Sequence, residues 1–230
     1  MMRVAAAILL ALFALGAAPL PFDSQMVLQR YELEMADLKT PKAMIFSYVV
    51  SQAGPTNIEQ RHTIYRSGLK VRDETLSVDG VGLKRKIVHI SQRVDRYALV
   101  RLAPRVSTYD FLFLRTVRNG KHFDYEFETS PIIHGASGFV VDRIIIDGER
   151  YLPRVIRFHT VGASASASGQ IAYGPAGGYW VPTSIAVSGS VNGKPARERI
   201  AWGAYRFPPS LPAATFRLAQ PIAPVALPTF

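Results

Sequence analysis

The sequence predicts a mainly β fold of the α+β class. We expect a large, curved antiparallel meander sheet or unclosed β-barrel of about ten strands, covered by an N-terminal helix. Only residues 24–38 keep apolar side chains at helical spacing over three turns. Short runs of β-branched and aromatic residues fill the chain after them. Asp-Gly or Asn-Gly pairs at 79–80, 119–120, 147–148 and 192–193 divide these runs, as expected for consecutive hairpins.

The N-terminus has the layout of a secretory signal peptide. One basic residue, Arg3, precedes an apolar run over 4–15 and a group of small residues. We therefore expect residues 1–18 to be a removed leader, and the mature chain to be soluble and periplasmic or secreted. A retained transmembrane anchor is the alternative, although 4–20 is at the short limit for a bilayer of about 30 Å. Because the chain has no cysteine, a lipid-bearing cysteine and disulfides are both excluded.

Residues 24–38 form the predicted helix. Asp23 or Ser24 can cap its first turn, and Pro41 marks where it must have ended. One face carries the apolar positions Val27, Leu28, Tyr31, Met35 and Leu38.

The Asp-Gly and Asn-Gly pairs also predict which residues face each other, because a two-residue loop fixes the register of a hairpin. Matched cross-strand pairs contribute about 0.2 to 1 kcal/mol each, so apolar and oppositely charged matches support a register. The predicted matches are Leu76 with Leu83, Glu74 with Arg85, Asp73 with Lys86, Val71 with Val88, Leu69 with Ile90, Arg115 with Asp124, Leu114 with Tyr125, Ile185 with Ile200, and Val187 with Glu198.

The strand at 109–114 is apolar on both faces, whereas its partner at 122–128 alternates. We expect Leu112 and Leu114 to join the aromatic row of the partner strand, with Phe111 and Phe113 on the opposite face. A sheet buried on both sides needs a cover for its second face. The helix is the regular element available for this. The aromatic row consists of Phe123, Tyr125 and Phe127.

The rest of the chain continues the hairpins and ends in a proline-rich tail. Pro153 interrupts one strand and predicts an edge or a bulge. Residues 162–169, with the sequence GASASASG, are predicted to be a flexible loop. Six prolines after residue 207 exclude a central strand, so we expect an extended segment along the domain as far as Phe216. The predicted organisation is a single β domain over 24–216 and a C-terminal tail over 217–230.

The charge of the chain is strongly basic, with 27 Lys and Arg against 17 Asp and Glu, a net charge of +10. This balance suits an anionic membrane surface, and scattered solvated charge explains it equally well. No motif for nucleic acid, phosphate cradling or a catalytic serine is present, and the five histidines have neither zinc spacing nor a nearby acidic partner. We therefore expect no catalysis, no cofactor, no metal, no nucleic acid partner and a monomer.

The aromatic and aliphatic surface exceeds what one face of a sheet needs. A curled meander encloses more volume than its own side chains fill, so part of this surface can line a pocket for an apolar ligand. Packing of an ordinary core is the alternative for each residue alone. The candidate ligand-binding residues are Phe46, Tyr48, Leu112, Leu114, Phe123, Tyr125, Phe127, Phe158 and Trp180.

The chain resembles the LolA-like and LolB-like periplasmic lipoprotein-carrier superfamily. The resemblance rests on the leader, the helix with its LKTPKA exit at 38–43, the strand AMIFSYVV at 43–50, the consecutive hairpins, and the runs at 150–160 and 179–191. It implies an unclosed β-barrel whose mouth is covered by helices and which shields acyl chains. Two departures stand out: no lipid-accepting cysteine, which excludes an anchored LolB-like receptor, and one helix where the carriers have additional lid helices. No single site residue carries over.

These observations favour a soluble, exported, non-catalytic carrier or binding protein for a lipid, a lipoprotein or another hydrophobic ligand. A sensory or protein-interaction module that uses the tail or an exposed strand edge is the first alternative. An envelope hydrolase is the second. Two carboxylates clustered in a cleft, or a histidine paired with a carboxylate there, would favour that hydrolase.

Overall fold

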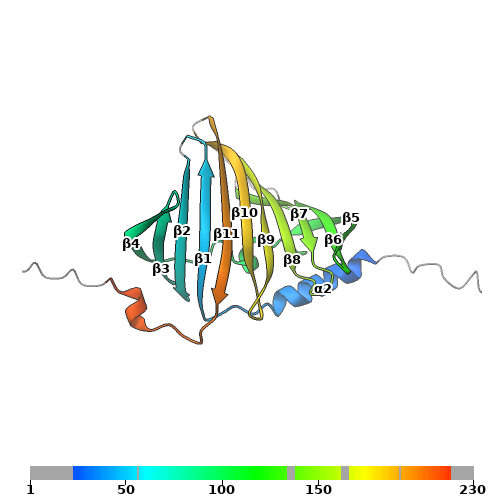
Figure 1. Ribbon diagram of the computed structural model, residues 1–230. Coiled ribbons are helices and arrows are strands. Elements are labelled where there is room, and N and C mark those ends of the chain that lie inside the picture. Colours follow the sequence, from blue (N-terminus) through cyan, green and yellow to red (C-terminus); the bar gives the residue numbers. More distant parts are fainter. Residues whose placement is uncertain (1–22, 56, 134–137, 162–165, 192, 219–230) are drawn as a thin grey trace, which may run out of the picture.

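The computed structural model describes residues 23–55, 57–133, 138–161, 166–191 and 193–218. Eleven antiparallel strands form one strongly curved sheet, with helix α2 (Ser24–Ala36) along one half of it (Figure 1). The predicted fold class is confirmed. The strands are β1 (Ala43–Ala53), β2 (Ile58–Ser67), β3 (Lys70–Val78), β4 (Val81–Gln92), β5 (Tyr109–Asn119), β6 (His122–Pro131), β7 (Gly138–Ile146), β8 (Pro153–Val161), β9 (Ala167–Ala176), β10 (Tyr179–Val191) and β11 (Lys194–Arg206).

The curved sheet is not closed, and its opening lies between two consecutive strands. Its order is β4-β3-β2-β1-β11-β10-β9-β8-β7-β6-β5, so the first strand pairs with the last. In the described residues β4 and β5 share no ladder, and each is an edge. Residues 93–108, here called the crossing segment, connect these two edges and include the short helix α3 (Leu99–Leu102). The first and last strands of the meander are therefore paired, and the gap in the sheet lies between β4 and β5.

Helix α2 begins as the sequence predicted and packs on one half of the sheet. The Asp23 carboxylate accepts hydrogen bonds from the backbone N–H groups of Gln25 and Met26, which caps the first turn. The helix ends at Ala36, two residues before the predicted end. Its buried face carries four of the five predicted residues, Val27, Leu28, Tyr31 and Met35.

The main core lies between α2 and strands β6 to β9. Phe127 is fully buried, and its ring contacts Phe111 and Phe113 at centroid distances of 6.1 and 5.5 Å. Tyr31 of α2 contacts Phe111 at 5.9 Å. The helix thus covers the Phe111 and Phe113 face of β5, as predicted. The opposite face of β5 is not buried: Leu112 is 64% exposed and faces Glu128, so the expected match of Leu112 with the aromatic row is wrong.

The hairpin between β10 and β11 confirms its predicted register, with Ile185 opposite Ile200 and Val187 opposite Glu198. Gly193 in its turn has φ 75°, which glycine adopts without strain.

The register predicted across Asp79-Gly80 is correct only beside the turn. Both residues have positive φ, 48° and 77°, as a type I′ turn requires. Ser77 is opposite Gly82, but Thr75 is opposite Ile87. Between these two pairs β3 has moved by two residues and β4 by five, so a bulge in β4 shifts the register. Lys86 still reaches the carboxylate of Glu74 at 2.9 Å, because its long side chain spans the shift. The observed pairs are Glu74 with Val88, Asp73 with His89, and Val71 with Ser91.

The turn predicted at Asn119-Gly120 lies one residue later. Asn119 is paired with His122, and Gly120 has φ 61°. Arg115 therefore faces Glu126 instead of Asp124, and a further bulge follows before Phe113, so the two predicted matches are wrong.

Asp147-Gly148 begins a longer connection instead of a two-residue turn. The backbone N–H of Asp147 bonds to the carbonyl of Leu152, and a Cβ on Gly148 would lie 1.8 Å from the carbonyl oxygen of Phe123. Glycine is needed there for this close approach. Pro153 opens β8 beside a bulge in the β7–β8 ladder, as predicted.

Two terminal or loop predictions changed as well. Residues 162–165 of the predicted loop lie outside the described residues, but 167–169 belong to β9 and pair with β8, so the loop is shorter than expected. The segment before the tail, predicted to be extended as far as Phe216, contains a short 3₁₀ helix at Ala213–Phe216, and the carbonyl of Thr215 accepts a hydrogen bond from Arg72. The leader at 1–18 and the end of the tail lie outside the described residues.

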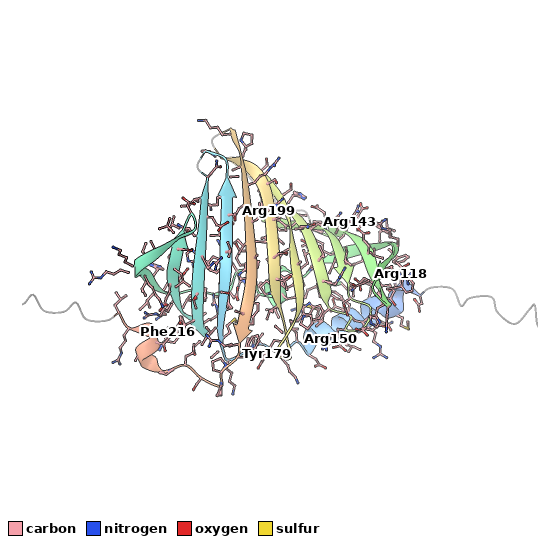
Figure 2. The ribbon with its side chains drawn as sticks, viewed as in Figure 1. Arg118, Arg143, Arg150, Tyr179, Arg199 and Phe216 are labelled. Atoms are coloured by element: carbon pink, nitrogen blue, oxygen red, sulfur yellow. The ribbon has the colours of Figure 1, made fainter. Side chains whose placement is uncertain are left out.

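Basic side chains are spread over the molecule, as Arg118, Arg143, Arg150 and Arg199 show in Figure 2. Some of them neutralise buried carboxylates. Glu126, which is 1% exposed, accepts from Arg143 at 3.2 Å.

Candidate functional site

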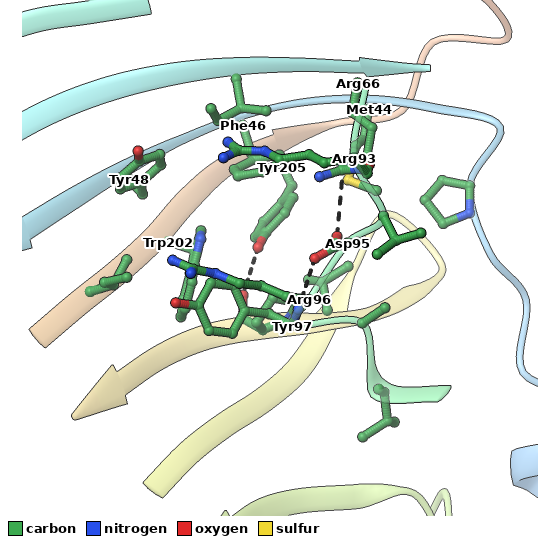
Figure 3. Close-up of a pocket in the computed structure, with 18 of the residues that line it drawn as sticks. Met44, Phe46, Tyr48, Arg66, Arg93, Asp95, Arg96, Tyr97, Trp202 and Tyr205 are labelled. Atoms are coloured by element: carbon green, nitrogen blue, oxygen red, sulfur yellow. Dashed lines mark hydrogen bonds and ion pairs between the residues drawn. The ribbon is translucent and has the colours of Figure 1, made fainter. Parts of the chain in front are cut away.

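A cavity of about 830 Å³ lies between the concave face of the sheet and the crossing segment (Figure 3). Its wall comes from β1, β2, β10 and β11, and the residues that follow α2 reach its mouth. The volume falls in the range of ligand pockets, about 300 to 1,000 Å³. Its apolar lining includes Met44, Phe46, Val50, Ile64, Leu69, Val94, Leu99, Val100, Trp180, Val181, Ile200 and Trp202.

Strand alternation explains which side chains face the cavity. Successive side chains of a strand point to opposite faces of the sheet. Every second residue of β1 and β2 lines the cavity, and their neighbours face the other way. The cavity-lining positions are Met44, Phe46, Tyr48, Val50 and Gln52 of β1, and Gln60, His62, Ile64 and Arg66 of β2.

The cavity opens through an apolar rim. Leu69, Val94 and Val100 line it and are 55%, 49% and 37% exposed. Exposed apolar side chains that lead into an apolar cavity provide an entry for a ligand that avoids water.

The crossing segment is held to both neighbouring layers. The ring of Tyr97 packs edge-on against Trp202 of β11, with 5.0 Å between the ring centroids. The backbone carbonyl of Tyr97 accepts a hydrogen bond from the Tyr173 hydroxyl at 3.0 Å. On the other side, the carbonyl of Pro104 accepts from the Tyr31 hydroxyl of α2, and Glu32 accepts from the backbone N–H of Val106 at 2.8 Å. The segment forms a wall of the cavity through these contacts.

A histidine and an aspartate form a polar cluster on the wall. The Nδ1 of His62 lies 2.7 Å from an Asp73 oxygen, and its ring stacks on Tyr48 at 4.5 Å with an interplanar angle of 4°. Tyr48 donates to the other Asp73 oxygen at 3.3 Å. Burial, followed by the charge and hydrogen bond of Asp73, raises the pKa of the Tyr48 phenol, which is therefore a neutral donor at physiological pH. Asp73 also lies 3.7 Å from Arg93.

The pairing of His62 with Asp73 was not visible in the sequence. They are eleven residues apart on β2 and β3, and a bulge between Arg61 and His62 shifts the ladder there. His159 and Asp142 form a second such pair at 2.6 Å on β8 and β7. The statement that the histidines have no nearby acidic partner is therefore wrong. Neighbouring strands bring these side chains together although the residues are not directly opposite each other, and their spacing in sequence gives no sign of it.

The nine predicted ligand-binding residues separate into three groups. Phe46, Tyr48 and Trp180 line the cavity together. Phe127 and Phe158 are 0% and 6% exposed and belong to the main core, where Tyr125 is partly buried against them. The third group, Leu112, Leu114 and Phe123, is exposed and does not line this cavity. A role in ligand binding stays a prediction for all nine.

Sequence reasoning missed Arg66 of β2 and the residues that the crossing segment and β11 contribute, such as Arg96, Tyr97 and Trp202. Trp202 had a usable signal, since Glu198, Ile200 and Trp202 alternate on β11 in the same way as the β1 residues do.

In the part of the chain that the structure describes, no group of three His, Asp or Glu side chains could hold a metal ion. None of the described helices has the length and apolar character needed to cross a membrane.

The sequence matches no protein-family model and none of the curated proteins. Among solved structures, the chain is similar to a DUF1329 family protein from Desulfovibrio piger, at 12% identity and a TM-score of 0.47, covering 84% of this chain and 96% of that one. It is similar to a LolA superfamily protein from Nitrosomonas europaea, at 13% identity and a TM-score of 0.39, covering 86% and 98%.

A third similar structure is a putative outer membrane lipoprotein-sorting protein domain from Vibrio parahaemolyticus, at 13% identity and a TM-score of 0.44, covering 84% and 97%. Because all three TM-scores are below 0.5, the function proposed below rests on the geometry of this chain.

Proposed function

We propose that this protein is an exported carrier that binds a lipid, or the acyl chain of a lipid-modified partner, in the cavity beneath the crossing segment. The observation that carries the proposal is the size and lining of this cavity, about 830 Å³ bordered by apolar side chains of four strands. Each buried methylene contributes about 0.8 kcal/mol, so ten of them supply about 8 kcal/mol before the costs of association. Shape and apolarity are then sufficient for binding without catalysis.

The apolar rim supports the same proposal. Leu69, Val94 and Val100 leave a path for an acyl chain that keeps it in contact with apolar side chains on entry. A basic exterior would bring such a carrier to an anionic membrane surface, where lipids are taken up or delivered.

The test is displacement of N-phenyl-1-naphthylamine, a neutral fluorescent probe, by hexadecanol. Val50→Phe places a ring in the cavity, and we expect it to weaken binding of both molecules at least about tenfold. Val49→Phe is the matched control, because Val49 points to the other face of β1 and does not line the cavity. Equal binding by both variants, or no binding by the unchanged protein, contradicts the proposal. Native mass spectrometry of protein purified from its own host would identify the cargo.

A second candidate is hydrolysis of an ester held in the same cavity. It is favoured by one observation, the 2.7 Å contact between His62 and Asp73 in the wall. An aspartate that orients a histidine leaves the other ring nitrogen as a general base. Here that nitrogen, Nε2, lies 3.3 Å from the amide oxygen of Gln60, and a base for hydrolysis would need water or a hydroxyl there.

Release of p-nitrophenol from p-nitrophenyl acyl esters separates the two candidates. A carrier binds the ester without turnover. Turnover that His62→Gln removes, while binding of the neutral probe persists, would favour hydrolysis.

A further inference from the structure

We propose that the cavity is specific for anionic amphiphiles. An acyl chain would occupy the apolar part, and an oxyanion headgroup, carboxylate or phosphate, would bind to the guanidinium groups of Arg66, Arg93 and Arg96. This inference rests on the proposed function, since it adds a headgroup site to the same cavity.

Arg66 carries the argument, because it is a buried cation that is incompletely paired. It projects from β2 into the cavity and is 8% exposed. Its Nη1 donates to the backbone carbonyl of Arg93 at 2.9 Å, but its Nε has no hydrogen-bond partner among the described residues. The nearest carboxylate, Asp95, lies 3.9 Å from that Nε. A buried charged donor without a partner is costly, and the charge of an anion bound beside the guanidinium would offset part of this cost.

The carboxylates of the cavity do not neutralise its cations. The lining contains five cationic side chains, Lys39, Arg66, Arg93, Arg96 and Arg101, and three carboxylates, Asp73, Asp95 and Glu198. Two of these carboxylates contact the arginines only at long distance, Asp95 at 3.9 Å from Arg66 and Asp73 at 3.7 Å from Arg93. Each has a shorter contact elsewhere: Asp95 accepts from the backbone N–H of Tyr97 at 3.0 Å, and Asp73 contacts His62 at 2.7 Å. The cavity therefore has an excess of positive charge inside an apolar wall.

The electrostatic state of Arg66 agrees with this geometry. Burial lowers the pKa of its guanidinium, and the charge of Arg93 lowers it further, while Asp95 only partly opposes them. A bound anion would act in the opposite direction and favour the charged form.

Arg93 and Arg96 complete the site. The Arg93 side chain is 51% exposed, and the guanidinium carbon of Arg96 lies 4.8 Å from the centre of the Tyr97 ring. Figure 3 shows Arg66, Arg93 and Arg96 in the same part of the cavity, beside its aromatic wall. Guanidinium groups suit carboxylate and phosphate because they present several N–H donors in a plane. The three arginines are thus placed to hold an oxyanion whose chain continues into the cavity.

The experiment compares ligands that share a chain and differ in headgroup. Displacement of N-phenyl-1-naphthylamine is measured at pH 8 with palmitate, palmitoyl lysophosphatidate, hexadecanol and inorganic phosphate. We expect both anionic amphiphiles to bind about tenfold more tightly than hexadecanol, as charge-assisted hydrogen bonds predict. The preference between carboxylate and phosphate identifies the headgroup. Phosphate alone should displace nothing and should not weaken palmitate binding.

Substitutions test whether these arginines cause the tighter binding of anionic amphiphiles. Arg66→Gln should weaken palmitate binding about tenfold and leave hexadecanol binding within about twofold. Arg96→Gln should act in the same direction, and it avoids disturbing a buried position if Arg66→Gln fails to fold. Arg61→Gln is the matched control, because Arg61 is an exposed residue of β2 that does not line the cavity.

Three outcomes would overturn the inference. The first is equal binding of palmitate and hexadecanol by the unchanged protein. The second is equal weakening of both ligands by Arg66→Gln and Arg96→Gln, which would give these residues a structural role only. The third is competition by inorganic phosphate, which would show a site for free anions. In each case binding of hexadecanol leaves the proposed carrier function standing, whereas loss of all binding removes both.

Discussion

Strands β5–β8 and strands β1–β3 both present large apolar side chains on a concave face, but these faces are covered differently. On the first, the buried face of the thirteen-residue helix α2 packs against the sheet, and Phe127, Ile144 and Ile156 are 0% exposed. On the second, the cover is the crossing segment, whose helix α3 has four residues. Phe46 and Tyr48 there border a cavity.

The difference shows that the cavity results from the cover and not from the wall. Both faces follow the same alternation along the strands, and both contain aromatic contacts such as Phe113 with Phe127 and Phe46 with Tyr205. A long amphipathic helix supplies enough side chains to fill a concave face. A short connection tied down at a few points does not.

The largest expected effect comes from the same substitution in each half. Phe127→Ala should lower the free energy of unfolding by about 3 to 5 kcal/mol, because the fully buried ring leaves a closed void. Phe46→Ala should cost less, about 1 to 2 kcal/mol, since its ring already borders open volume and loses fewer contacts. Urea denaturation of both variants measures the difference. Equal losses would mean that the two halves are packed alike.

A smaller effect is expected from the buried carboxylates of the two halves. Burial raises the pKa of Glu126, but hydrogen bonds and charges from Arg115 and Arg143 lower it more, so the net shift is downward. Its folded pKa thus lies below the unfolded value of about 4.3, so the stabilisation is present above about pH 5 and is lost as pH falls through the folded pKa. Glu74 is lowered in the same way by Lys86 and Arg72.

Glu126→Gln should lower the free energy of unfolding by about 2 kcal/mol at pH 7 and reduce the loss of stability on acidification. Glu74→Gln should cost about 1 kcal/mol, because the Lys86 side chain is 56% exposed and solvent screens its charge. Urea denaturation between pH 3 and pH 7 tests both variants. A steeper acid loss in Glu126→Gln than in the unchanged protein would contradict the sign.

The smallest effect concerns the tail beside the cavity half. Arg72 donates to the carbonyls of Thr215 and Arg217, both at 3.2 Å. Arg72→Gln should cost about 1 kcal/mol or less and should speed tryptic cleavage after Arg217 several-fold. Lys86→Gln is the control, because Lys86 shares Glu74 with Arg72 and forms no hydrogen bond or ion pair with the described residues of the tail. Equal cleavage rates in the two variants would show that Arg72 does not hold the tail.

The sequence predicts registers well where a tight turn is followed by an uninterrupted ladder. The pairing of Ile185 with Ile200 is of this kind. It fails across Asp79-Gly80, because the bulge beyond Ser77 resets the register, and a bulge leaves no mark in an alternating pattern. The same reason explains why Leu112 was assigned to the wrong face.

The candidate site was predictable only for its wall. Phe46 and Tyr48 stand two residues apart on one strand, so alternation placed them on one face correctly. The cover was not predictable, because residues 93–108 have no regular pattern and their position depends on long-range contacts such as Tyr97 with Trp202. Arg66 could not be recognised as a buried cation of the cavity until the position of this cover was known.

The opening between β4 and β5 also determines how the cavity is sized. In a closed barrel the number of strands and their stagger fix the diameter. Here no ladder joins the edges β4 and β5 among the described residues, so strand pairing does not fix the width of the curved sheet. The spacing between wall and cover is set instead by a few side-chain contacts, among them the hydrogen bond of Tyr173 to the carbonyl of Tyr97. Ligands of different width could then be accommodated by a movement of the crossing segment. This movement would cost those side-chain contacts but would break no strand pair.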